Sequence, residues 1–281
     1  MTTGTIDRGE GVELHWEERG EGPLVVISCH WSGYPPVFEP LIEELQNDHR
    51  IVTYDARGTG RSSRRGPHDM VTGAADLSAV IERTGRAAVI VTMTDACNRA
   101  VRVAAARPDL VAGVIAPGTL PVHRSALEGT QALISSDAVV DAFLEMLAND
   151  YRGAQRTMMA TANPQMSEDE VRERVNLQIA YCPADVALER TKAWRNDDPS
   201  VAARECGDRL WLLWSPDMVG PWFPPVHEVD RVLSGELPEA HLEAIDIGPI
   251  SAPGLTAEIV RRVTAPADDA LRAAHQSAEP A

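Results

Sequence analysis

The sequence predicts an α/β fold, in which a mostly parallel sheet is flanked by helices and a helical lid is inserted between two strands. Two observations lead to this prediction. Apolar, β-branched runs alternate with segments of helical periodicity in the first half of the chain, a pattern typical of a parallel sheet covered on both faces. Between residues 120 and 205 helical periodicity prevails, and strand signals return only after it.

The predicted strands are short. Pro23–Cys29 and Ala87–Val91 are apolar and β-branched throughout most of their length, as expected for strands buried on both faces of a sheet. The other predicted strands are Val12–Glu17, Arg50–Tyr54, Leu110–Ile115, Arg209–Trp214 and His241–Ile245.

The predicted helices have apolar residues at helical spacing or are rich in alanine. In chain order they are Phe38–Leu45, Ala74–Ile81, Cys97–Ala106, Ala138–Met146, Glu168–Ile179, Asp185–Trp194 and Leu255–Val263. Arg107 and Pro108 end the third of them. The predicted organisation is a core of residues 1–119 and 206–266, a lid of residues 120–205 and a flexible tail of residues 267–281.

The composition indicates a globular protein with an acidic surface. The 281 residues are 44% hydrophobic, which suffices for a buried core. A formal net charge of -16 repels phosphate backbones and anionic lipid, so neither nucleic acid nor a membrane is expected as a partner. The N-terminal residues lack the basic and apolar regions of a secretory signal, and no apolar run approaches the ~20 residues that span a bilayer. These features predict a cytoplasmic protein.

The cysteines and the motif content give no indication of a bound group. Four widely spaced cysteines, without a Cys-x-x-Cys pattern, indicate reduced thiols rather than disulfides or a zinc site. No motif indicates a nucleotide, a flavin or a metal, so no cofactor is expected. A small-molecule substrate is the expected partner, and the oligomeric state stays open.

Three segments carry more specific information. Ser28-Cys29-His30-Trp31 ends a strand, Asp55-Ala-Arg57-Gly58-Thr-Gly60-Arg61-Ser62 follows another, and a strand, a turn and a helix span Val89–Pro108. Together they resemble the α/β-hydrolase superfamily, in the branch that has a lid over the active site, across about residues 10–265. The resemblance implies a ligand pocket at the C-terminal ends of the strands.

The resemblance also implies a nucleophile at the strand-to-helix turn, where the family has Gly-x-Ser-x-Gly. Alignment puts Thr94 in place of the serine, with Thr92 and Ala96 in place of the glycines. A β-branched residue is strained at positive φ, so either the turn is relaxed or Thr94 is held under strain. A shift of one residue would put Asp95 at the turn, although the helix spacing fits Thr94 better.

The other two members of the family's Ser-His-Asp triad follow the last two strands. Asp217, in Trp214-Ser-Pro-Asp217, matches the acid. The histidine position holds Ile250, which cannot accept a proton, and the neighbouring Ser251 cannot act as a general base at neutral pH. The sequence therefore predicts a triad that lacks at least the serine and the histidine.

Four residues are candidates to complete the site. Asp95 stands where a helix dipole favours a carboxylate, so it is either a helix cap or a general base or ligand anchor. His123, just after the fourth parallel strand, is a candidate replacement for the missing histidine. His30 matches a histidine that shapes the family's oxyanion loop, and Trp31 replaces a glycine there. Trp31 is expected to crowd the oxyanion hole, to stack on a ligand or to pack in the core.

Two functions follow from these residues. The first is an enzyme that acts on a small, largely apolar organic molecule bound near His30, Trp31 and Met93. Without a Ser-His pair, its mechanism would be a non-standard hydrolase or a lyase or cyclase type, in a setting such as secondary metabolism. The alternative is a catalytically inactive ligand-binding or scaffold protein of the same fold. Ile250 favours the alternative, whereas Asp217 and the polar turn favour the enzyme.

Overall fold

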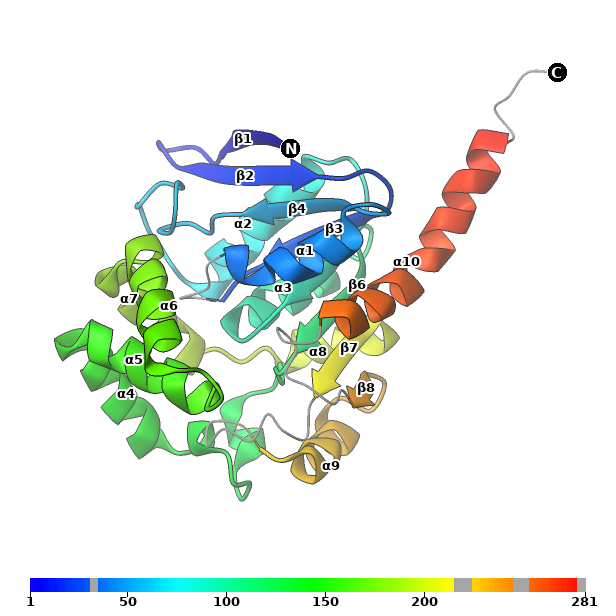
Figure 1. Ribbon diagram of the computed structural model, residues 1–281. Coiled ribbons are helices and arrows are strands. Elements are labelled where there is room, and N and C mark those ends of the chain that lie inside the picture. The colour runs from blue at the N-terminus through cyan, green and yellow to red at the C-terminus, as the bar shows by residue number, and fades with distance from the viewer. Residues whose placement is uncertain (31–34, 215–223, 245–252, 277–281) are drawn as a thin grey trace.

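The computed structural model shows a mostly parallel sheet with helices on both faces, as the sequence predicts (Figure 1). It describes residues 1–30, 35–214, 224–244 and 253–276. Within this part of the chain the strand order is β1-β2-β4-β3-β5-β6-β7-β8. The strands are β1 Thr2–Asp7, β2 Glu13–Arg19, β3 Leu24–Ser28, β4 Arg50–Tyr54, β5 Ala88–Thr92, β6 Val111–Pro117, β7 Leu210–Trp214 and β8 His241–Ala244.

The strand directions bring the ends of the central strands together. β1 pairs with β2, and β2 with β4, in antiparallel register, whereas every pair from β4 to β8 is parallel. The C-terminal ends of β3, β5, β6 and β7 therefore lie at one edge of the sheet, which is where open α/β sheets bind ligands.

Alternate residues of β3 pack against different layers of helices. Leu24 and Val26 belong to the apolar cluster formed with α2 Met70–Glu82, α3 Asp95–Ala106, α8 Ser200–Cys206 and α9 Val226–Glu236. Val25 and Ile27 belong to the cluster formed with α1 Glu39–Leu45, which follows the short helix η1 Pro35–Phe38, and α10 Pro253–Gln276. The sheet is therefore the middle of three layers.

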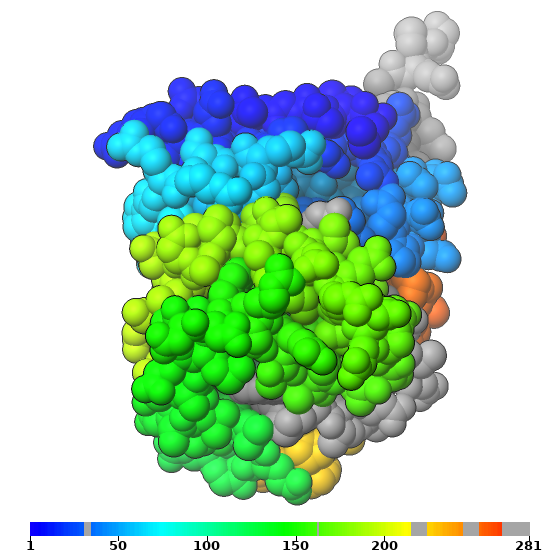
Figure 2. All heavy atoms as spheres, turned by 60° about the vertical axis from the view of Figure 1, so that its left-hand side comes forward, coloured from blue at the N-terminus to red at the C-terminus, as the bar shows by residue number. Residues whose placement is uncertain are grey.

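Four of the helices between β6 and β7 form an apolar cluster of their own: α4 Asp137–Asn149, α5 Tyr151–Ala162, α6 Glu168–Tyr181 and α7 Ala184–Arg195. The short helices η2 Arg124–Leu127 and η3 Leu133–Ser135, which precede them, pack in the same cluster as α2 and α3. Val140, Leu144, Tyr181 and Val186 are among the residues that α4, α6 and α7 bury together. We call α4 to α7 the inserted helices. Figure 2 shows them, in green, against the residues near position 60–75, in cyan.

The glycine-containing motif after β4 holds the inserted helices on the sheet. The Tyr181 hydroxyl at the end of α6 donates to Asp55 Oδ1 at 2.8 Å, and the Gly60 N–H donates to the Tyr181 carbonyl at 2.9 Å. Gly60 has φ +52, and a Cβ at this position would lie 2.4 Å from the Asp55 carboxylate and 2.6 Å from the Tyr181 ring. This part of the family motif is therefore structural.

The structure adds elements that the sequence patterns do not predict. β1 is an exposed edge strand whose Thr and Gly residues give no apolar signal. α5 was not predicted, and α8 packs against α3 with Ala203 and Cys206 in the apolar cluster of the sheet. α10 continues through Pro266 to Gln276, so residues 267–276, predicted as a tail, are helical. In the described ranges, no helix combines the length and apolar character needed to cross a membrane.

Candidate active site

Thr94 occupies the sharp turn between β5 and α3. Its backbone has φ 50 and ψ -130, and Glu10 is the other non-glycine residue with positive φ in the described chain. For a β-branched residue this conformation costs about 1–3 kcal/mol and persists only where the surroundings enforce it. Of the two predicted alternatives, the strained turn is the one observed, and Thr94 rather than Asp95 is the residue at the turn.

The end of β6 supports this strained turn. The Thr94 N–H donates to Thr119 Oγ1 at 2.6 Å, and the Thr119 hydroxyl is also within 3.2 Å of the Pro117 carbonyl. On the other side of the turn, the Cys97 N–H donates to the Thr94 carbonyl at 2.9 Å, which starts α3. Thr119 was not predicted as a site residue, because its role depends on the parallel pairing of β5 with β6.

Asp95 is the centre of a buried cluster of charged groups. It is 1% exposed, and its Oδ1 lies 3.4 Å from the Thr94 hydroxyl, which donates to it. Its Oδ2 lies 3.3 Å from Arg99 Nη2 and 3.4 Å from Arg190 Nη2. Asp95 therefore connects the turn to α3 and to the inserted helix α7, beyond the predicted role of a helix cap.

The two arginines belong to no motif that marks them as site residues. Arg99 and Arg190 are both 3% exposed, and Arg99 Nη2 also donates to the Cys29 carbonyl at 2.7 Å. A signal for Arg190 was present, because Val186, Ala187 and Thr191 place it on the buried face of α7. Its partner Asp95 lies 95 residues away in the chain, and no local pattern indicates such a pair.

His30 lies at the end of β3, beside the charged cluster. Loss of solvation lowers its pKa from 6.5 to about 4, and the positive charges of Arg190 and Arg99 act in the same direction. The negative charge of Asp95 opposes this shift and raises the pKa. The imidazole is therefore neutral at pH 7, a state in which it can both donate and accept a hydrogen bond.

His123 contacts serine side chains of η2 and α8. Its Nδ1 lies 2.7 Å from Ser125 Oγ, and its backbone N–H donates to Ser200 Oγ at 2.9 Å. It thereby caps η2, and its role as a base stays a prediction. The predicted residues Trp31, Asp217 and Ile250 lie outside the described residues, as does Ser251.

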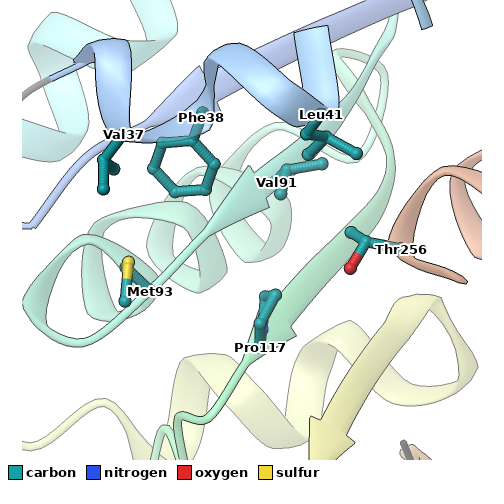
Figure 3. A pocket seen from close by; sticks show the side chains of 7 residues that line it. All are labelled: Val37, Phe38, Leu41, Val91, Met93, Pro117 and Thr256. Carbon is teal, nitrogen blue, oxygen red and sulfur yellow. The ribbon is translucent and has the colours of Figure 1, made fainter. Parts of the chain in front are cut away.

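Two hollows flank the turn on opposite faces of the sheet. The first, which we call the apolar hollow, is shown in Figure 3 and includes Met93, one of the predicted pocket residues. Its lining is Val37, Phe38, Leu41, Val91, Met93, Pro117 and Thr256. The second, which we call the arginine hollow, lies between α2, α3 and α7 and is lined in part by Arg99 and Arg190.

The cysteines do not supply a nucleophile to this site. All four are buried free thiols. Burial raises the pKa of Cys29 to about 12 and also raises the pKa of Cys97, although Cys97 lies in the first turn of α3. Among the described residues, no three His, Cys, Asp or Glu side chains are grouped as metal ligands.

Comparisons with known proteins agree with the fold. The sequence matches no protein-family model. It is 26% identical over 186 residues to 2-(acetamidomethylene)succinate hydrolase from Mesorhizobium japonicum, across 65% of this chain and 63% of that relative, which is less than two thirds of its length. The crystal structure of E-2-(acetamidomethylene)succinate hydrolase has a TM-score of 0.70 at 19% identity, covering 93% of this chain and 98% of the other.

An esterase from Exiguobacterium antarcticum is similar in structure to the same degree. Its TM-score is 0.74 at 18% identity, with 92% of this chain and 98% of that chain covered. The chain therefore has the α/β-hydrolase fold. In this fold, the turn at Thr94 stands where the resemblance places the family's nucleophile. The connection from β8 to α10, where the resemblance places the family's histidine, comprises residues 245–252, and the sequence has no histidine there.

Proposed function

We propose that this protein of α/β-hydrolase fold is an enzyme that transforms a small organic molecule at the Thr94 turn without a Ser-His pair. The observation that carries this proposal is the φ of +50 at Thr94. This conformation lowers the stability of the fold when a threonine adopts it, and backbone strain of this kind clusters at active sites. The turn also directs the N-terminal end of α3 towards the site, where it favours developing negative charge.

The proposal that the Ser-His pair is missing is supported by the sequence between β8 and α10. Ile250 is the residue aligned with the family's histidine, and an aliphatic side chain cannot accept a proton. We therefore propose that Asp95, whose Oδ1 is 3.4 Å from the Thr94 hydroxyl, accepts the proton of an attacking water or of the substrate beside this turn. Its two arginine partners hold the carboxylate in place.

The other groups have complementary roles in this proposal. His30 in its neutral form donates a hydrogen bond to the reacting oxygen of the substrate, since neutral histidine serves as an electrophile in other enzymes. The apolar hollow receives the apolar part of the substrate, and the inserted helices act as a lid. The reaction is a hydrolysis by activated water or an elimination or cyclisation, and the hydrolases named among the relatives support hydrolysis.

A panel of p-nitrophenyl esters and lactones tests this proposal. We expect Asp95→Asn to lower kcat/KM by about 100-fold or more, the scale of a lost general base. Thr94→Ala is expected to lower it by about tenfold only. Asp137→Asn on α4, an exposed aspartate that also pairs with two arginines, is the matched control and should retain full activity. Circular dichroism verifies that each variant is folded.

Two results would contradict the proposal. Complete loss of activity in Thr94→Ala, with a burst of nitrophenol in the wild type, would make Thr94 a nucleophile after all. No turnover of any compound, together with tight binding of an apolar one, would favour the alternative of a ligand-binding or scaffold protein. Ile250 is the feature that favours this alternative.

A further inference from the structure

The arginine hollow is a small space between four elements. Tyr54 and Arg57 line it from the end of β4, Gly73 from α2, Arg99 from α3 and Arg190 from α7. Its volume of about 20 Å³ has room for the terminal oxygens of a ligand, and the hollow is open on one side, where the remainder of a ligand would lie.

The charges around the hollow are unevenly satisfied. Asp76 is bound by Arg57 through two contacts of 2.9 and 2.8 Å, and Asp69 accepts hydrogen bonds from Thr72. In contrast, Arg99 and Arg190 share a single carboxylate oxygen, Asp95 Oδ2, at 3.3 and 3.4 Å. Charge-assisted hydrogen bonds between such groups are normally about 2.7–2.9 Å long.

Both arginines also have a buried nitrogen that binds nothing in the described chain. Arg99 Nε and Arg190 Nη1 are enclosed and have no hydrogen-bond acceptor. Buried donors are satisfied in the great majority of protein structures, and donors on charged groups are the most costly to leave unsatisfied. Two such donors, from two different helices, lie on residues that line one hollow.

The sequence of α2 makes room for this arrangement. A Cβ at Gly73 would lie 2.5 Å from Arg99 Cδ and 3.7 Å from Arg99 Nε. A glycine within a helix is unfavourable, because it has the largest loss of backbone entropy on folding. Because glycine has no Cβ, Gly73 leaves space for the Arg99 side chain beside the hollow.

We propose that the arginine hollow binds the carboxylate of a small organic acid, with Arg99 and Arg190 as the donors. A planar carboxylate matches the geometry of guanidinium groups and supplies acceptors for both unsatisfied nitrogens. A monoanion fits better than a phosphate dianion, because Asp69 and Asp76 also line the hollow and its volume is small. That the carboxylate belongs to the substrate rests on the function proposed above; the site itself does not.

Saturation-transfer NMR with propionate as the probe tests the site directly. We expect saturable binding to the wild-type protein and none of propionamide, which has the same shape without the charge. Arg190→Lys keeps a positive charge beside Asp95, so the protein folds, but it removes the forked donor and is expected to weaken binding by about tenfold or more. Arg195→Lys, on the same helix but paired with Asp137 and Asp141, is the matched control and should bind propionate normally.

Three results would overturn the site: no propionate binding to the wild type at 100 mM, equal binding of propionamide, or undiminished binding to Arg190→Lys. Thr94→Ala is expected to bind propionate as the wild type does. This separates the site from the reaction, because propionate binding without turnover of any ester supports the site and contradicts the proposed function.

A pair of substrates tests whether the carboxylate belongs to the reacting molecule. A p-nitrophenyl ester with a free terminal carboxylate is compared with its methyl-capped form. We expect the wild type to prefer the free acid by about tenfold in kcat/KM and Arg190→Lys to lose the preference. Equal kcat/KM for both esters in the wild type would overturn the assignment of the carboxylate to the substrate.

Discussion

The two hollows beside the Thr94 turn differ in what holds them together. The apolar hollow is built from side chains of η1, α1, β5 and α10, which are near in space because apolar faces of regular elements pack together. The arginine hollow depends on Asp95, Arg99 and Arg190, which interact through their charges. The apolar hollow should therefore tolerate changes in side-chain shape, whereas the arginine hollow depends on each member of the charged cluster.

The largest difference is expected from Asp95→Asn. This change leaves two buried guanidinium groups without a counter-charge, and breaking a buried ion pair by removal of one partner costs about 3–5 kcal/mol. We expect the free energy of unfolding, measured by urea denaturation, to fall by this amount. A loss below about 1 kcal/mol would show that solvent reaches the cluster and that the two sides do not differ as stated.

Asp137→Asn provides the matched comparison for this measurement. Asp137 also pairs with two arginines, Arg124 and Arg195, but its side chain is 66% exposed. Because water screens such pairs, we expect its free energy of unfolding to stay nearly unchanged. The pair of variants separates the effect of burial from the effect of losing a carboxylate.

The second prediction concerns pH and the histidine beside the charged cluster. The folded-state pKa of His30 is about 4, against 6.5 for the unfolded chain, so the unfolded chain binds more protons between these values. The contribution of His30 is therefore fully present above pH 6.5 and is lost as the pH falls towards 4. We expect a loss of up to about 3 kcal/mol in the free energy of unfolding across this range.

His30→Gln isolates this contribution from the carboxylates that titrate in the same range. The difference between wild type and variant is measured by urea denaturation at pH 7.5, 6 and 5. It should decrease steadily towards low pH, because only the wild type has a group that resists protonation when folded. A difference that is independent of pH would contradict the lowered pKa. It would mean that Asp95 raises the pKa of His30 as much as burial, Arg99 and Arg190 lower it.

The elements that pack through apolar residues can be predicted from the sequence, whereas the charged contacts of the site mostly cannot. Most strands and the helices α1, α2 and α3 are predicted because burial imposes a periodic or continuous apolar pattern on neighbouring residues, as in β3 and β5. The resemblance located the turn at Thr94 within one residue. β1 was missed because an exposed edge strand needs no apolar alternation.

The charged side of the site was largely beyond prediction. Arg99 and Arg190 are on helices that also carry the more exposed Arg102 and Arg195, and only Arg190 has a local signal of burial, from its apolar neighbours on α7. Gly73 gave a partial signal, because a glycine inside a helix indicates a close approach. The contact of Arg190 with Asp95, 95 residues away, depends on how α7 is placed beside the start of α3, which only the folded chain reveals.

The smallest effect is expected on the apolar side, at Thr256. Its hydroxyl is buried in the apolar hollow and has no hydrogen-bond partner in the described chain. Thr256→Val replaces this hydroxyl with a methyl group of similar size, so we expect the free energy of unfolding to rise by about 1 kcal/mol. Thr119→Val is the matched change at the turn, where the hydroxyl accepts the Thr94 N–H, and it should lower the free energy by about 1–2 kcal/mol. Opposite changes in the free energy of unfolding for Thr256→Val and Thr119→Val would show that the apolar hollow gains no stability from its hydroxyl group. Changes of the same sign would contradict the difference between the apolar hollow and the turn.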